Sequence, residues 1–84
     1  MRKKHRETLR AVFDRPIRAD LNWEAVEAML RALGADISEG RGSRVRISLN
    51  GVDAVLHRPH PRKEMDKGAV RSLQRFLSEA GVEL

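Results

Sequence analysis

The sequence predicts an α+β fold in which helices cover one face of a three-stranded antiparallel sheet, as a two-layer sandwich. Three segments carry apolar residues at helical spacing, and three short extended segments lie between the second and third of them. Asn50-Gly51 is the strongest two-residue hairpin signal that a sequence offers. Because only one face of the middle strand is apolar, we expect the helices on that face and a ligand or solvent on the other.

A short helix is predicted over residues 5–14. Pro16 ends this helix or lies just past its end, because a proline disfavours the α conformation of the residue before it. Residues 15–21 then form a connector. The residues that give the short helix an apolar face are Leu9, Val12 and Phe13.

A second helix is predicted over residues 23–33. Asn22 is a favoured N-cap, and Gly34 is placed to end the helix in the left-handed conformation that glycine adopts without strain. Its apolar stripe, with i, i+3, i+4, i+7 spacing, consists of Trp23, Val26, Met29, Leu30 and Leu33.

The sheet is predicted from residues 35–38, 44–49 and 52–57, with a flexible turn over 39–43. The middle segment alternates strictly between apolar and polar residues, as a half-buried strand does. Two prolines in residues 58–61 exclude both a helix and strand pairing there.

A last helix is predicted over residues 67–80, capped by Asp66 and closed by Gly81. Its apolar face consists of Val70, Leu73, Phe76, Leu77 and Ala80. The resulting α-β-β-β-α order resembles the layout of double-stranded-RNA-binding domains (dsRBD-like), with an extra N-terminal helix. We therefore expect a single domain over residues 1–84, in which residues 1–21 are an N-terminal helical extension.

The composition points to a polyanionic partner. The 84 residues include 17 Lys and Arg against 12 Asp and Glu, a net charge of +5, and nucleic acid is the commonest partner of such a chain. The chain has no cysteine, no apolar run long enough to span a membrane and no secretory signal, so we expect a cytoplasmic protein without disulfides. No metal-ligand spacing or cofactor motif is present, so we expect neither a metal nor a cofactor.

The two-residue turn fixes which residues face each other across the predicted hairpin, namely those whose numbers sum to 101. On the apolar face the pairs are Leu49 with Val52, Ile47 with Ala54, and Val45 with Leu56. On the polar face they are Ser48 with Asp53, Arg46 with Val55, and Arg44 with His57. The all-apolar pairs support this register independently of the turn.

The Arg44–His57 pair has the residue types that RNA cleavage without a metal requires. A base takes the 2′-OH proton, a cation stabilises the phosphoryl oxygens, and an acid protonates the departing 5′ oxygen. Histidine exchanges protons near neutral pH, and arginine clamps phosphate. The alternative is that both residues belong to an ordinary solvated face. The basic residues expected to contact RNA are Arg41, Arg46, Arg58, His60, Lys63 and Lys67, with Arg62 and Arg71.

Several short motifs, in order, resemble the HicA toxin family over about residues 22–82. They are Leu33-Gly34, Gly42-Ser43 at the start of a strand, His57-Arg-Pro-His-Pro61, Lys63-Glu64, Lys67-Gly68 and Ala80-Gly81. The resemblance implies a small toxin that cleaves mRNA and tmRNA without a metal and is neutralised by a HicB antitoxin.

One position departs from the family pattern. The catalytic histidine of the family follows the Gly-Ser pair, where this chain has Arg44, and arginine does not accept a proton at neutral pH. Either His57 transfers the proton while Arg44 holds the phosphate, or the chain is an inactive member that binds RNA or its antitoxin, or Arg44 is an inactivating change. Three functions therefore compete: an endoribonuclease (mRNA interferase), a non-catalytic RNA-binding module, and a module that docks an acidic protein.

Overall fold

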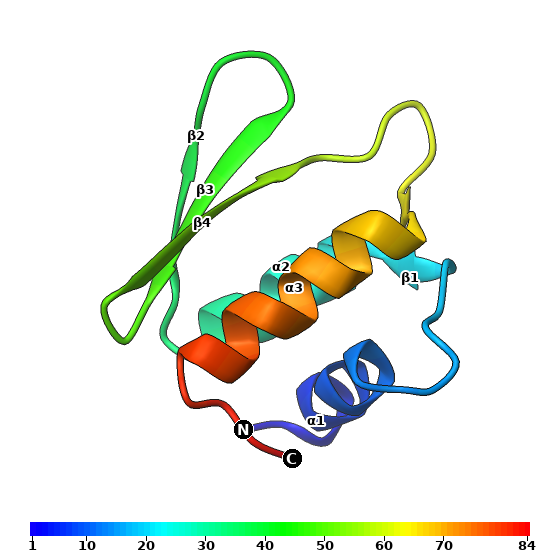
Figure 1. Ribbon diagram of the computed structural model, residues 1–84, viewed down its shortest axis with the longest axis vertical. Coiled ribbons are helices and arrows are strands. Elements are labelled where there is room, and N and C mark those ends of the chain that lie inside the picture. Colours follow the sequence, from blue (N-terminus) through cyan, green and yellow to red (C-terminus); the bar gives the residue numbers. More distant parts are fainter.

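The computed structural model describes residues 1–84, and it is an α+β fold as the sequence predicts. It has three helices, a three-stranded sheet of consecutive strands, and a small sheet that pairs two strands far apart in the sequence (Figure 1). The elements are α1 (Lys3–Val12), β1 (Leu21–Asn22), α2 (Trp23–Ala32), β2 (Asp36–Glu39), β3 (Arg44–Leu49), β4 (Val52–His57), β5 (Glu64–Met65) and α3 (Lys67–Glu79).

The larger sheet is antiparallel in the order β2-β3-β4, and its hairpin has the predicted register. Asn50 and Gly51 have φ angles of +52° and +81°, the two positive values that a type I′ turn requires. Arg44 accordingly faces His57, and Val45 faces Leu56. The same register continues into β2, where Asp36 faces Ser48.

The helices cover one face of this sheet. In Figure 1, α2 and α3 lie against the sheet, and α1 packs on the far side of the helical layer. The 18 buried residues are all apolar, and most come from the three helices and from the inward faces of β3 and β4. The sheet therefore keeps its opposite face free of helices, as predicted. No helix is long and apolar enough to cross a membrane.

The predicted helix ends are confirmed. The side chain of Asn22 accepts a hydrogen bond from the backbone N–H of Ala25, and that of Asp66 accepts one from Ala69. Gly34 has a φ angle of +94°, the left-handed conformation expected of a residue just after a helix. These caps set where α2 and α3 begin, and so how they lie on the sheet.

The boundaries differ from the prediction at four elements. The helices α2 and α3 each end one residue earlier than predicted, at Ala32 and Glu79, and the other two elements differ at both ends. The N-terminal helix covers Lys3–Val12 rather than residues 5–14, because its first turn is wholly polar and carries no apolar periodicity. The first strand of the larger sheet covers Asp36–Glu39 rather than 35–38. Ala35 instead caps α2, donating its backbone N–H to Leu30.

The small sheet of β1 and β5 was not predicted. Leu21 pairs with Met65 and Asn22 with Glu64, and both apolar side chains are buried. The backbone N–H of Trp23 donates to the carbonyl of Lys63 over 2.8 Å and continues this pairing. Two-residue strands are too short for alternation to reveal them, so residues 15–21 and 62–66 resembled plain loops.

Candidate functional site

The outer face of the larger sheet presents its side chains in three rows across the strands. The register places Asp36, Ser48 and Asp53 in the row next to the hairpin turn. The middle row contains Ser38, Arg46 and Val55. The third row contains Arg44 and His57, at the end of the sheet farthest from the turn.

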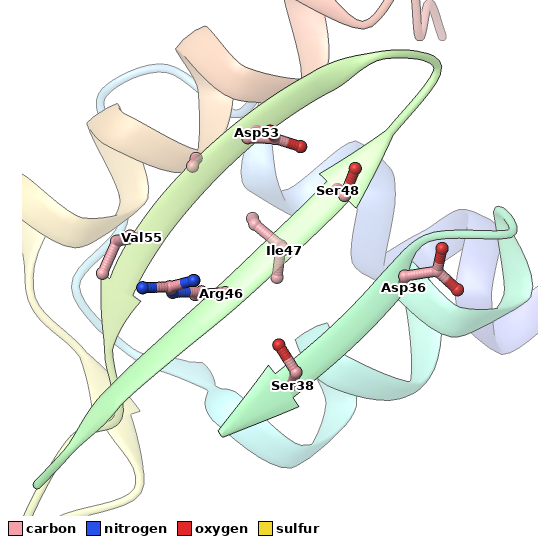
Figure 2. A pocket seen from close by; sticks show the side chains of 8 residues that line it. Asp36, Ser38, Arg46, Ile47, Ser48, Asp53 and Val55 are labelled. Atoms are coloured by element: carbon pink, nitrogen blue, oxygen red, sulfur yellow. The ribbon is translucent and has the colours of Figure 1, made fainter. Parts of the chain in front are cut away.

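Charge on this face is separated along the strands. Figure 2 shows Asp53 and Ser48 near the turn, with Arg46 farther along β3 beside Val55 of β4. These side chains line a shallow hollow of about 420 Å³. Two carboxylates therefore lie at one end of the face and the arginines at the other. A phosphate group is favoured only at the arginine end.

The Arg44–His57 pair forms the row farthest from the turn, at the end of the outer face that has the arginines. Residues directly opposed in an antiparallel ladder have Cβ atoms about 4.5–5.5 Å apart. Both side chains are exposed, so both are accessible to a ligand. The Oγ atom of Ser43 lies 3.4 Å from Nδ1 of His57, which is a long and weak hydrogen bond, so Nε2 is the ring nitrogen that remains for a ligand.

Two neighbouring hollows, each of about 380 Å³, divide the predicted site residues between them. Arg44 lines the first together with Arg41 and Arg46, which gathers three guanidinium groups in one place. His57 lines the second together with His60 and Arg62. The cross-strand pair thus joins a cationic hollow to a hollow that contains two imidazole rings.

Two of the predicted RNA contacts are held in ion pairs instead. The Arg58 guanidinium donates to both carboxylate oxygens of Glu39, over 2.7 and 3.1 Å. Nζ of Lys63 lies 2.6 Å from the Glu24 carboxylate. The hydrogen bond that Arg58 donates to Glu39 raises the pKa of Arg58, and the one that Lys63 donates to Glu24 raises the pKa of Lys63, so both cations stay charged but are largely neutralised by their partners.

The remaining predicted contacts, Lys67 and Arg71, are exposed on α3, and neither lines either of these two hollows. No three His, Asp or Glu side chains converge in a way that would hold a metal ion. The acidic end of the outer face was missed in the sequence. To place Asp36 in this face, the sequence would have had to fix the pairing of β2 with β3. The turn of residues 40–43 is too long to fix that pairing by its length alone.

Comparison with known proteins gives one match. The sequence family described as the HicA toxin of bacterial toxin-antitoxin matches residues 23–82. Neither a curated protein nor a solved structure matches the chain. The matched range includes the larger sheet, both hollows, α2 and α3, and it excludes α1.

Proposed function

Because the chain belongs to the HicA toxin family of bacterial toxin–antitoxin systems, we propose that it is an endoribonuclease that cleaves mRNA without a metal ion. In this proposal it acts in the cytoplasm, blocks translation, and is neutralised by a HicB-type antitoxin. The toxin role follows from the family. The observation that supports the nuclease reaction is the direct cross-strand pairing of Arg44 with His57 on the exposed sheet face.

The proposed reaction is an internal transesterification of RNA. Nε2 of His57 takes the proton of a 2′-OH group, and the 2′ oxygen forms a bond to the adjacent phosphorus. The bond from phosphorus to the 5′ oxygen breaks, which leaves a 2′,3′-cyclic phosphate and a 5′-hydroxyl. His60, which lines the same hollow as His57, supplies the proton to the leaving oxygen.

The arginines stabilise the charge that develops on the phosphoryl oxygens. Arg44 lies across from the base, and Arg41 and Arg46 share its hollow. Guanidinium groups stay charged and donate two parallel hydrogen bonds to a phosphate. The two carboxylates at the turn end repel the RNA backbone, whereas the hollow that Arg44 lines contains no carboxylate, so a phosphate is favoured in that hollow.

Cleavage of a labelled RNA by the purified, folded chain in EDTA tests the proposal. We expect fragments that end in a 2′,3′-cyclic phosphate, and no cleavage of the same oligonucleotide carrying 2′-O-methyl groups, because the attacking hydroxyl is then absent. RNA that stays intact after long incubation with the folded protein would contradict the nuclease assignment.

A second candidate is a non-catalytic member that binds RNA or its antitoxin. Arg44 favours it, because the family resemblance places a catalytic histidine at this position. The Arg44→His variant separates the two candidates. If the chain is inactive because it lacks that histidine, Arg44→His cleaves RNA and the parent chain does not. If His57 is the base, the parent chain cleaves and Arg44→His gains little.

A further inference from the structure

Most of the net positive charge of the chain lies outside the part that matches the family. Residues 1–22 contain seven basic and three acidic residues, a net charge of +4 out of the +5 of the whole chain. The matched range begins at residue 23. The excess charge that indicated a nucleic-acid partner therefore comes mainly from α1 and the segment after it.

Part of this charge borders a hollow between that segment and α3. The hollow has a volume of about 290 Å³ and contains three guanidinium groups and no carboxylate. The residues that line it are Phe13, Arg15, Arg71, Gln74, Arg75 and Ser78. Arg71 and Arg75 are one turn apart on α3, so both lie on the same exposed side of that helix.

A hydrogen bond and buried side chains hold the residues around the hollow in place. Nε2 of Gln74 donates a hydrogen bond of 2.8 Å to the carbonyl of Val12, which ties the end of α1 to α3. Val12 is fully buried, and Phe13 is half-buried against the core. Arg15 therefore follows directly after residues that are fixed against α3 and the core.

None of the three arginines is in a salt bridge. By contrast, Arg18 pairs with Asp14 and Asp20, and Arg31 pairs with Glu27. Two more unpaired arginines, Arg6 and Arg10, extend the cationic surface, because they lie at i, i+4 with Phe13 at i+7 and so share its face of α1. We name the set Arg6, Arg10, Arg15, Arg71 and Arg75 the α1–α3 basic surface.

We propose that the α1–α3 basic surface is a second RNA-binding surface, which holds the phosphodiester backbone away from the cleavage site. The identity of the ligand rests on the proposed function. Five arginines that are in no salt bridge fit a partner with evenly repeated negative charge, and phosphate contacts of this kind carry no sequence information. The residues of this surface belong to α1, the segment after it and α3, and both helices lie on the side of the larger sheet opposite its outer face (Figure 1).

The dimensions allow one RNA to reach both surfaces. The longest extent of the chain is 31 Å. Even at the 3.4 Å that each nucleotide occupies along a duplex strand, a 20-nucleotide strand is about 68 Å long, roughly twice that extent, and is long enough to pass around the molecule. Contacts at the α1–α3 basic surface therefore increase affinity for RNA without taking part in the chemical step.

Binding of a 20-nucleotide 2′-O-methyl RNA, which is not cleaved, tests the proposal by fluorescence anisotropy across a salt series. We expect the triple variant Arg15→Gln/Arg71→Gln/Arg75→Gln to bind at least about 10-fold more weakly at low salt. Its plot of log K against log salt loses about 2 units of slope, since each single-strand phosphate contact contributes about 0.7. In cleavage assays we expect this triple variant to have a higher KM than the parent chain and the same kcat.

Two controls separate charge at this surface from charge in general. Arg31→Gln removes an arginine that is paired on α2, and we expect it to bind like the parent chain. Arg15→Lys/Arg71→Lys/Arg75→Lys retains the charge, and we expect it to retain most of the affinity. Thermal unfolding confirms that each variant is folded.

The outcomes distinguish this proposal from the proposed function. A glutamine triple variant that binds with the affinity and salt slope of the parent overturns the second surface, even if the parent cleaves RNA. A parent chain that does not cleave, yet loses RNA binding in the triple variant, overturns the nuclease and leaves this surface intact. A parent chain that binds no RNA overturns both.

Discussion

At the scale of single residues, Arg44 determines how the site can work. A guanidinium does not accept a proton at neutral pH, so the proposed reaction assigns proton transfer to the imidazole opposite it in the ladder. In that proposal the arginine binds the phosphate at the position where the base would otherwise stand. We therefore propose that the pair divides the roles of proton acceptor and charge stabiliser between two residues.

Asp20 supplies a residue-scale prediction about pH. The hydrogen bond from Arg18 lowers the pKa of Asp20 below its ordinary 3.8, since the guanidinium favours the carboxylate. The ion pair then stabilises the fold above pH 3.8, and this contribution is lost as the pH falls through the lowered pKa. The effect is small because the pair is exposed.

The measurement is the melting temperature of the parent chain and of Asp20→Asn from pH 6 down to pH 2. We expect Asp20→Asn to melt lower at pH 6 and the difference to vanish in acid. A difference that is equally large at pH 2 would show that the carboxylate charge is not involved.

The sequence was sufficient to place Arg44 beside His57, because a two-residue turn determines every pair of its hairpin. It was not sufficient to show that Arg58 and Lys63 are held by Glu39 and Glu24. Those partners are far away along the chain, and only the packing of β2 and α2 brings them within reach. Cations that are equivalent in the sequence therefore differ in whether a carboxylate already pairs with them.

At the scale of elements, the hairpin turn does more than reverse the chain. Asn50 adopts a left-handed φ, and its side-chain Nδ2 donates a hydrogen bond of 2.8 Å to the carbonyl of Ala80. That carbonyl lies at the end of α3, where backbone acceptors lack helical partners. Asn50 therefore fixes the tip of the sheet to the end of a helix.

Substitution of Asn50 separates these two roles. Asn50→Gly keeps the left-handed backbone and loses the hydrogen bond, and we expect it to lower the free energy of unfolding by about 1 kcal/mol. Asn50→Ala also strains the turn and costs about 1–2 kcal/mol more. Urea unfolding measures both, and a larger loss for glycine than for alanine would contradict this account of the turn.

Elements with clear periodicity and caps were predicted closely, and those without were not. The caps Asn22 and Asp66 and the turn at Asn50 are local signals that survive folding. The pairing of Leu21 with Met65 joins segments far apart in the sequence and has no local signal. Met65 is buried for that reason, although its surroundings in the sequence are polar.

At the scale of the whole molecule, α1 contributes to the same core as the family-matched part. Leu9 and Val12 are buried among residues of α2 and α3. We therefore propose that residues 1–84 unfold as one unit, with residues 1–21 an integral extension. The extension then supplies both apolar contacts and most of the net charge.

Leu9→Ala tests this unity. Truncating a buried leucine lowers the free energy of unfolding by about 2–5 kcal/mol, and in a single cooperative unit this loss applies to the whole molecule. We expect one urea transition, shifted equally for far-UV circular dichroism and for the fluorescence of Trp23, the sole tryptophan, which lies on α2. A helical signal that is lost before the Trp23 signal would show that α1 unfolds separately.

The single-turnover rate of RNA cleavage by His57→Ala, beside the parent chain and His5→Ala, tests the central claim most directly. Proton transfer by a positioned side chain is worth about 10²–10⁴ in rate, so we expect His57→Ala to lose at least about 100-fold. His5 lies on α1, away from the outer sheet face, and its variant should cleave like the parent. Cleavage by folded His57→Ala at the parental rate would contradict the claim that the cross-strand pair is the active centre.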